Sequence, residues 1–86
     1  MITLEIGKTY KVKNEKIIYF PAQHGIKSGS ERYMYAETIF LILNKVIHAR
    51  NIDCYEIFYD NKIVFFFINK EYNEDKELDA LFEYVI

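Results

Sequence analysis

Six consecutive large apolar residues, at positions 63–68, constrain the fold of this 86-residue chain more than any other feature. Successive side chains of a β-strand point to opposite faces of the sheet, so a strand built from this run is apolar on both faces. One layer of helix covers only one of them. The sequence therefore predicts either a sheet with a helix on each face, or a sheet with one face left for another molecule.

The composition indicates a single domain that comprises residues 1–86. Hydrophobic residues make up 51% of the chain and aromatic residues 17%, well above the level of disordered segments. The one cysteine, Cys54, cannot form a disulfide within the chain, which favours a cytoplasmic location. No targeting segment is recognisable and no apolar run approaches the ~20 residues of a membrane-spanning helix, so we expect no membrane contact. Abundant Phe, Tyr, Ile, Asn and Lys suggest a low-GC genome such as that of a phage.

The predicted fold class is α+β, with the element order ββαββα and an antiparallel four-stranded sheet built from two hairpins. Alternating apolar residues at positions 2–12 and a polar turn before residues 17–20 predict the first hairpin. The helical period of residues 31–51 predicts one long helix, for which Ser28 begins a capping box. Met34 and Leu41 fall on the polar side of this helix, where a partner could reach them.

The second predicted hairpin joins residues 54–59 to residues 63–69 through Asp60 and Asn61, which tolerate the positive φ of a two-residue turn. In this register one face carries Tyr55, Ile57, Tyr59, Val64, Phe66 and Ile68. The other face carries Cys54, Glu56, Phe58, Ile63, Phe65 and Phe67. Residues 75–85 predict a short C-terminal helix, whose apolar stripe comprises Leu78, Leu81, Phe82 and Val85.

The leading functional hypothesis is a small non-enzymatic protein-binding module, an inhibitor or modulator of a host protein that a phage or mobile element encodes. Its basis is the surplus aromatic surface and the four-residue spacing of Asp75, Asp79 and Glu83, an acidic stripe suited to a basic partner. The predicted contact residues are aromatic anchors, acids at their rim and the two apolar residues of the long helix: Phe65, Phe67, Tyr72, Asp79, Glu83, Tyr84, Met34 and Leu41. A homodimer is compatible with this role.

A nucleic-acid-binding protein is the alternative. Residues 1–50 carry eight Lys or Arg against four acids, whereas residues 51–86 carry three against nine. In the basic half, cations are interleaved with Tyr10, Tyr19, Tyr33 and Tyr35, which supplies phosphate contacts and stacking rings. The loop 24–32 before the predicted helix offers an anion site formed by His24, Lys27, Ser28, Ser30 and Arg32. A net charge of −2 and a pI of about 5.6 weigh against this alternative.

No catalytic or metal-binding constellation is recognisable, so we expect no enzymatic activity, cofactor or metal ion. The neighbouring Asp53 would raise the pKa of the Cys54 thiol and make it less reactive. His24 and His48 lack the cysteines or clustered acids of a zinc site. Glu56 could act as an acid–base group if desolvated, but exposure at the sheet edge is the favoured interpretation. No motif resembles a known family.

Overall fold

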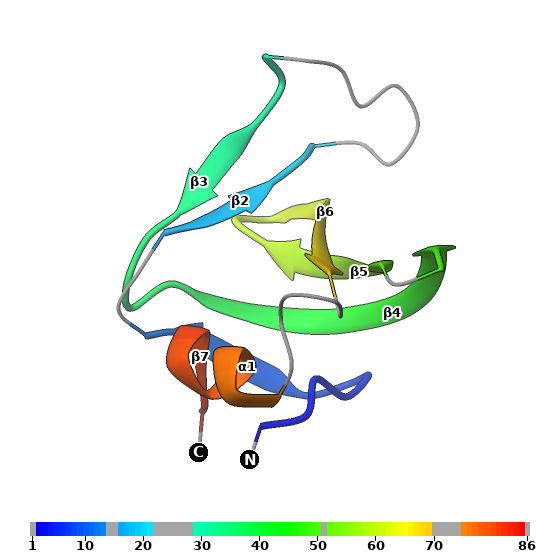
Figure 1. Ribbon diagram of the computed structural model, residues 1–86. Coiled ribbons are helices and arrows are strands. Elements are labelled where there is room, and N and C mark those ends of the chain that lie inside the picture. Colours follow the sequence, from blue (N-terminus) through cyan, green and yellow to red (C-terminus); the bar gives the residue numbers. More distant parts are fainter. Residues whose placement is uncertain (1, 14–15, 22–28, 51, 70–74, 86) are drawn as a thin grey trace.

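The computed structural model describes residues 2–13, 16–21, 29–50, 52–69 and 75–85, and it consists mainly of β-strands (Figure 1). Five strands form one antiparallel sheet in the order β6-β5-β4-β1-β7. Their bounds are Thr9–Val12 for β1, Ile39–Ala49 for β4, Ile52–Tyr59 for β5, Lys62–Asn69 for β6 and Phe82–Tyr84 for β7. A separate two-stranded ribbon pairs β2 (Ile17–Tyr19) with β3 (Arg32–Met34). One short helix, α1 (Asp75–Leu81), precedes β7.

The predicted α+β fold with a four-stranded sheet and a long helix is wrong. Residues 31–51 contain no helix in their described part: β3 and the eleven-residue strand β4 occupy this region, and β4 pairs with both β1 and β5. The segment is apolar on both faces of the strand, and a helical period can be fitted to such a run as easily as a strand. The β-branched residues Ile39, Ile42, Val46 and Ile47 favour the strand.

Two further elements differ from the prediction. The expected first hairpin does not form, because β1 pairs with β4 and β7 while β2 pairs with β3. The C-terminal helix ends at Leu81, four residues before its predicted end, and Phe82 begins strand β7, where it lies opposite Val12. The described helix has seven residues, and a helix this short depends on tertiary packing for its stability.

The second hairpin is confirmed in both its turn and its register. Asp60 and Asn61 have φ angles of 53° and 59°, as a two-residue turn with two left-handed residues requires. The pairs Tyr55↔Phe66, Ile57↔Val64 and Tyr59↔Lys62 lie on one face of β5 and β6, and the pairs Cys54↔Phe67, Glu56↔Phe65 and Phe58↔Ile63 lie on the other. The two faces therefore carry the side chains that the sequence assigned to them.

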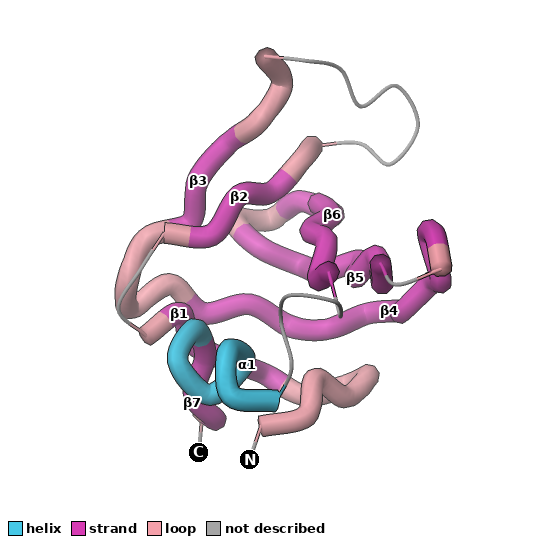
Figure 2. Tube along the Cα trace, viewed as in Figure 1, coloured by secondary structure: helices cyan, strands magenta, loops and turns pink. Residues whose placement is uncertain are grey.

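One face of the five-stranded sheet forms the hydrophobic core, and we call it the inner face. Four aromatic side chains are almost completely buried there: Tyr10, Phe40, Phe66 and Phe82. The centroid of the Phe40 ring is 5.5–6.2 Å from the ring centroids of the other three. The ribbon covers part of this face, and α1 lies beside β1 and β7 (Figure 2). Apolar residues from the N-terminal segment, the ribbon and α1 complete the cluster: Ile2, Leu4, Ile17, Tyr19, Met34, Leu78 and Leu81.

The N-terminal segment is held against the sheet by Tyr10. The Tyr10 hydroxyl donates to the carbonyl oxygen of Thr3 at 2.6 Å and accepts from the amide of Glu5 at 2.8 Å. Burial, only partly opposed by the hydrogen bond from the Glu5 amide, raises the pKa of Tyr10 above its usual value. The phenol therefore remains protonated and able to donate at neutral pH.

Candidate functional site

On β4, β5 and β6 the face of the sheet opposite the core is also apolar, and we call this three-stranded part the outer face. Its side chains follow from the alternation along β4, β5 and β6: Ile39, Leu41, Leu43, Asn44, Val46, Cys54, Glu56, Phe58, Ile63, Phe65 and Phe67. The N-terminal segment, the ribbon and α1 contribute their apolar residues to the inner cluster. The outer face is exposed at the end that carries Ile39, Phe58 and Ile63, whereas Cys54 and Phe65 on the same face are buried.

Three outer-face residues form a row across neighbouring strands. Leu41 on β4 lies opposite Phe58 on β5, and Phe58 lies opposite Ile63 on β6. The Phe58 side chain is 43% exposed and that of Ile63 51%, whereas Leu41 is half-buried. Ile39, two residues before Leu41 on the same side of β4, is also exposed. The row is an apolar surface in contact with solvent.

The far edge of β6 is partly closed by Phe20, which follows β2. Its amide donates to the carbonyl oxygen of Phe65 at 2.7 Å, and the Phe65 amide donates to the carbonyl oxygen of Phe20 at 2.9 Å. The Phe20 ring also contacts Phe67 in a T-shaped pair at 5.6 Å. Consequently Phe65 is buried and Phe67 is half-buried, although both belong to the outer face.

A single carboxylate, that of Glu56, interrupts the apolar outer face of β5. Its neighbours along the strand are Cys54 and Phe58, and its partners across the sheet are Asn44 on β4 and Phe65 on β6. The side chain is half-buried rather than located at an exposed sheet edge. Among the described residues of β4, β5 and β6 that face this side, Glu56 is the one charged group.

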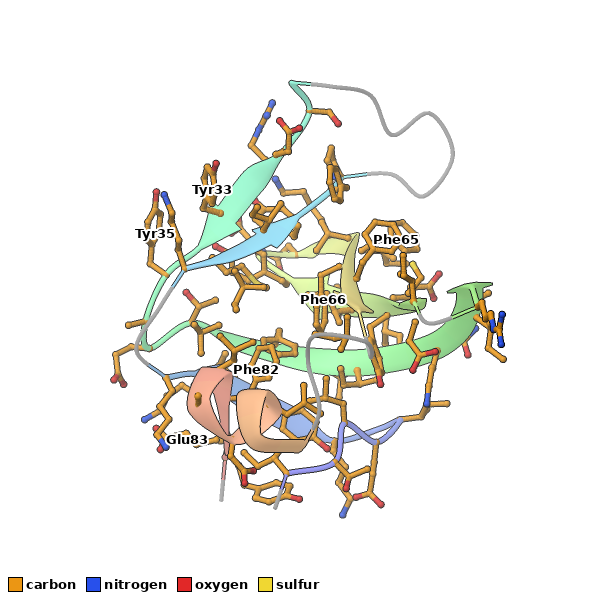
Figure 3. All side chains as sticks on the ribbon, in the orientation of Figure 1. Tyr33, Tyr35, Phe65, Phe66, Phe82 and Glu83 are labelled. Carbon is orange, nitrogen blue, oxygen red and sulfur yellow. The ribbon has the colours of Figure 1, made fainter. Side chains whose placement is uncertain are left out.

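A second solvent-facing surface lies on the ribbon, and we call it the ribbon patch. It consists of Lys16, Ile18, Tyr33 and Tyr35, which alternate with the core-facing residues of the two strands. Ile18 lies opposite Tyr33, and the ammonium of Lys16 is 4.4 Å from the centroid of the Tyr33 ring. Tyr33 and Tyr35 point away from the sheet, with their ring centroids 6.4 Å apart (Figure 3). The patch combines aromatic surface with positive charge.

The remaining predicted contact residues lie outside the apolar row, although Glu83 faces the same side of the sheet through its pairing with Lys11, the neighbour of Ile39. Met34 is buried in the core, Tyr72 lies outside the described residues, and Tyr84 is half exposed on β7 beside Tyr10. The backbone amide of Ile2 donates to the Asp79 carboxylate. Glu83 is on β7, so the expected stripe of Asp75, Asp79 and Glu83 on one helix does not form.

Lys11 links two acids at the β1–β7 side of the sheet. Its ammonium is 2.7 Å from the Glu83 carboxylate and 3.1 Å from that of Glu37. Hydrogen bonding to Glu83, and then to Glu37, raises the pKa of Lys11, and the hydrogen bond from Lys11 lowers the pKa of Glu83. Glu83 is therefore already engaged within the chain.

The predicted anion site loses the helix on which it depended. His24, Lys27 and Ser28 lie outside the described residues, and Ser30 precedes a strand rather than a helix. Arg32 opens β3, and its guanidinium donates to the carbonyl oxygen of Glu31 at 3.0 Å. Without a helix N-terminus, the expected array of free backbone amides is not formed by the described part of this loop.

The one cysteine and the candidate metal ligands were the residues considered for chemistry. Cys54 is buried on β5, as the sequence predicted for a small hydrophobic residue. Over the described ranges, no group of three or more His, Cys, Asp or Glu residues could hold a metal ion. A helix of sufficient length and apolarity to span a bilayer is likewise not found among the described residues.

Tyr55 and Asp53 form a buried polar cluster with Lys45 at one end of the inner face. The Lys45 ammonium is 3.4 Å from the Asp53 carboxylate and 5.9 Å from the centroid of the Tyr55 ring. Burial, and then the nearby charge of Asp53, raise the pKa of Tyr55 to about 12. The folded protein therefore keeps this phenol protonated at pH values where an unfolded chain ionises it.

This pKa predicts a loss of stability at high pH. An unfolded tyrosine ionises near pH 10, so between pH 10 and about 12 the unfolded state binds fewer protons than the folded state and the free energy of unfolding falls. We expect Tyr55 to account for roughly 1–2 kcal/mol of this fall after allowance for solvent screening. Urea denaturation of the wild type and of Tyr55→Phe at pH 9 and pH 11.5 measures it. The variant should lose less stability over this interval, and equal losses would contradict the assignment.

Comparison of the chain with protein-family models, with curated proteins and with solved structures gives no match. The outer face and the ribbon patch are the two surfaces suited to binding, and the sequence identified only parts of each. It selected Phe65, Phe67 and Leu41 of the outer face and Tyr33 and Tyr35 of the ribbon patch. It missed Phe58 and Ile63 as exposed contact residues, although their position beside the predicted turn was a usable signal, since residues near a hairpin end have fewer neighbours.

Proposed function

We propose that this chain is a small non-enzymatic protein-binding module and that its outer face is the binding surface. The observation that supports the proposal is the row Leu41–Phe58–Ile63, an apolar strip across three hydrogen-bonded strands. Extended apolar surfaces on a folded domain commonly mark interaction sites. Binding without chemistry would act by occupying a surface of the partner, as an inhibitor or modulator does.

The expected binding energy comes mainly from the exposed apolar side chains. Ile39, Phe58 and Ile63 are each about half exposed. Removing the remaining surface of each from water would contribute roughly 1 kcal/mol or more per side chain. Because β4, β5 and β6 hold these residues in a hydrogen-bonded sheet, little conformational entropy is lost on binding.

Site-specific photocrosslinking tests this proposal in the cells that encode the protein. We expect p-benzoylphenylalanine in place of Ile63 to give a discrete protein adduct, because this position lies in the proposed interface. The same amino acid in place of Ile18 is a matched control, since Ile18 is similarly exposed (47%) but lies on the ribbon. Adducts from position 18 alone, or from neither position, would contradict the proposal.

A pair of double variants separates the two surfaces. The outer-face variant is Phe58→Thr with Ile63→Thr, which alters a cross-strand pair of the β5–β6 hairpin. The ribbon variant is Ile18→Thr with Tyr33→Thr, which alters a cross-strand pair of the ribbon. Threonine retains the β-branched shape that strands favour, so both variants should fold. Loss of the crosslinked complex only in the outer-face variant is expected.

Nucleic-acid binding is a second candidate function, and the ribbon patch favours it. The Lys16 ammonium over Tyr33 and the exposed ring of Tyr35 provide a cation and stacking surfaces together. Tyr10 and Tyr19, which the sequence placed in the same set, are buried in the core. Fluorescence anisotropy with a labelled single-stranded oligonucleotide tests this candidate. Salt-sensitive binding that disappears in the ribbon variant would support it, and no binding at 50 mM salt would exclude it.

A further inference from the structure

The charge within the outer face indicates which kind of partner it accepts. Resting on the proposed protein-binding function, we propose that the outer face binds a protein partner that presents an arginine, surrounded by apolar residues, to the carboxylate of Glu56. The observation that carries this inference is the location of Glu56, between Phe58 on the same strand and Phe65 on the next.

The backbone pairing places Glu56 close to Phe65. The Phe65 amide and carbonyl both bond to Phe20, on the side of β6 away from β5. Glu56 and Phe65 are therefore a non-hydrogen-bonded pair, the type in which opposite side chains lie closest together. Phe58, two residues along β5, is on the same face about 7 Å away. The carboxylate thus has an aromatic side chain on two sides.

A partner that covers this surface must neutralise the carboxylate. Desolvating an ionised carboxylate against an apolar surface costs several kcal/mol unless a cation with hydrogen bonds compensates. The acidic balance of residues 51–86, nine acids against three bases, also favours the approach of a basic surface. A positive group on the partner is therefore required at this point of the interface.

Arginine fits this position better than lysine. Its planar guanidinium can donate two hydrogen bonds to one carboxylate and can stack on an aromatic ring at the same time. Phe58 is 43% exposed and offers such a ring beside Glu56. A lysine ammonium would pair with the carboxylate as a point charge, without the stacking contact.

The same carboxylate disfavours a second copy of this chain as the occupant. In a symmetric dimer centred on the outer face, Glu56 of one copy would approach either Glu56 of the other or the neighbours of that residue, which are apolar except for the neutral Asn44. The first arrangement brings like charges together, and the second buries a carboxylate with no cation to pair with it. A different protein with a complementary cation avoids both costs.

Selection of peptides from a random displayed library tests this inference. Binders of the wild type should be enriched in arginine flanked by apolar residues. In a synthetic peptide made from such a binder, changing the arginine to lysine should weaken binding at least 5-fold, and changing it to glutamine at least 10-fold. These changes lie in the peptide, so they cannot alter the fold of the protein.

The matching changes on the protein are Glu56→Gln and, as a control, Asp60→Asn. Both remove one negative charge from the β5–β6 hairpin, but Asp60 lies in the turn. Glu56→Gln should weaken the arginine peptide at least 10-fold and abolish its preference over the lysine peptide, whereas Asp60→Asn should change its affinity less than 2-fold.

The outcomes distinguish this inference from the proposed function. The inference is overturned if the selected peptides lack arginine, or if an arginine peptide binds the wild type and Glu56→Gln with equal affinity. In either case, loss of peptide binding in the outer-face variant would still support the outer face as the binding surface. Binding that persists in the outer-face variant would overturn the proposed function itself. A concentration-dependent dimer in sedimentation equilibrium that dissociates in the outer-face variant would identify a second copy as the occupant and would also overturn the inference.

Discussion

Replacement of Phe66 by alanine is expected to lower the free energy of unfolding by about 3–5 kcal/mol, which is a large part of the stability of a small domain. Phe66 is completely buried at the centre of the inner face. Its ring stacks on Tyr55 at 5.3 Å and contacts Phe40 at 5.6 Å and Phe82 at 5.8 Å. Alanine would leave a cavity among three rings from three different strands. Urea denaturation followed by circular dichroism measures the loss.

Phe58→Ala is the matched control for this prediction, because it makes the same chemical change on the opposite face of the sheet. Phe58 is 43% exposed, so its truncation removes less buried surface than that of Phe66, and we expect a smaller loss of about 1–2 kcal/mol. Similar losses for the two variants would contradict the assignment of the inner and outer faces.

The outer-face variant is expected to lose at least 30-fold in affinity for the partner that crosslinks at position 63. Phe58 and Ile63 are adjacent across the β5–β6 hairpin and are the two most exposed side chains of the row. A 30-fold change corresponds to about 2 kcal/mol, which is the loss expected when two apolar contacts are truncated. Isothermal titration calorimetry with the purified partner measures it.

The ribbon variant serves as the control for this affinity measurement. Ile18 and Tyr33 are also a cross-strand pair, and their exposed fractions of 47% and 40% resemble those of the outer-face pair. Their replacement should change the affinity less than 3-fold. If the ribbon variant loses more affinity for the partner than the outer-face variant does, the binding site lies on the ribbon and not on the outer face.

The β5–β6 hairpin shows which parts of this fold can be predicted from sequence. Its turn residues, Asp60 and Asn61, are among the few that accept a positive φ, and the short turn fixes the register. Once the register is fixed, the alternation of side chains assigns every residue to a face. The residues of the hairpin were therefore sufficient to predict it, because its two strands and the turn between them are contiguous in the sequence.

The long strand β4 shows where this approach fails. Its N-terminal half is apolar on both faces, so the alternation that marks a strand is masked and a helical stripe can be drawn through Ile39, Phe40 and Leu43. What makes this segment a strand is pairing with β1 on one side and β5 on the other. The pattern within residues 39–49 does not reveal that β1 and β5 will pair with this segment. Pairing in the folded protein therefore outweighs the helical pattern of the segment itself.

The candidate site was only partly predicted, because contacts between segments that are distant in the sequence also determine which side chains are exposed. The sequence identified two apolar faces but ranked Phe65 and Phe67 above Phe58 and Ile63 as contact residues. Phe65 is buried because Phe20, distant in the sequence, bridges to it at the edge of β6. The predicted acidic stripe is wrong because the helix ends before Glu83, whose carboxylate instead pairs with Lys11 from β1.

The central claim is that this sheet has one face buried in the core and another that is open to a partner. Paramagnetic relaxation of side-chain protons by a neutral gadolinium chelate measures both faces in one sample. We expect strong broadening for Phe58 and Ile63 and little for Val64 and Phe66, which lie on β6 and point into the core. Equal protection of Phe58, Ile63 and Phe66 would show that the outer face is already covered and would contradict the account.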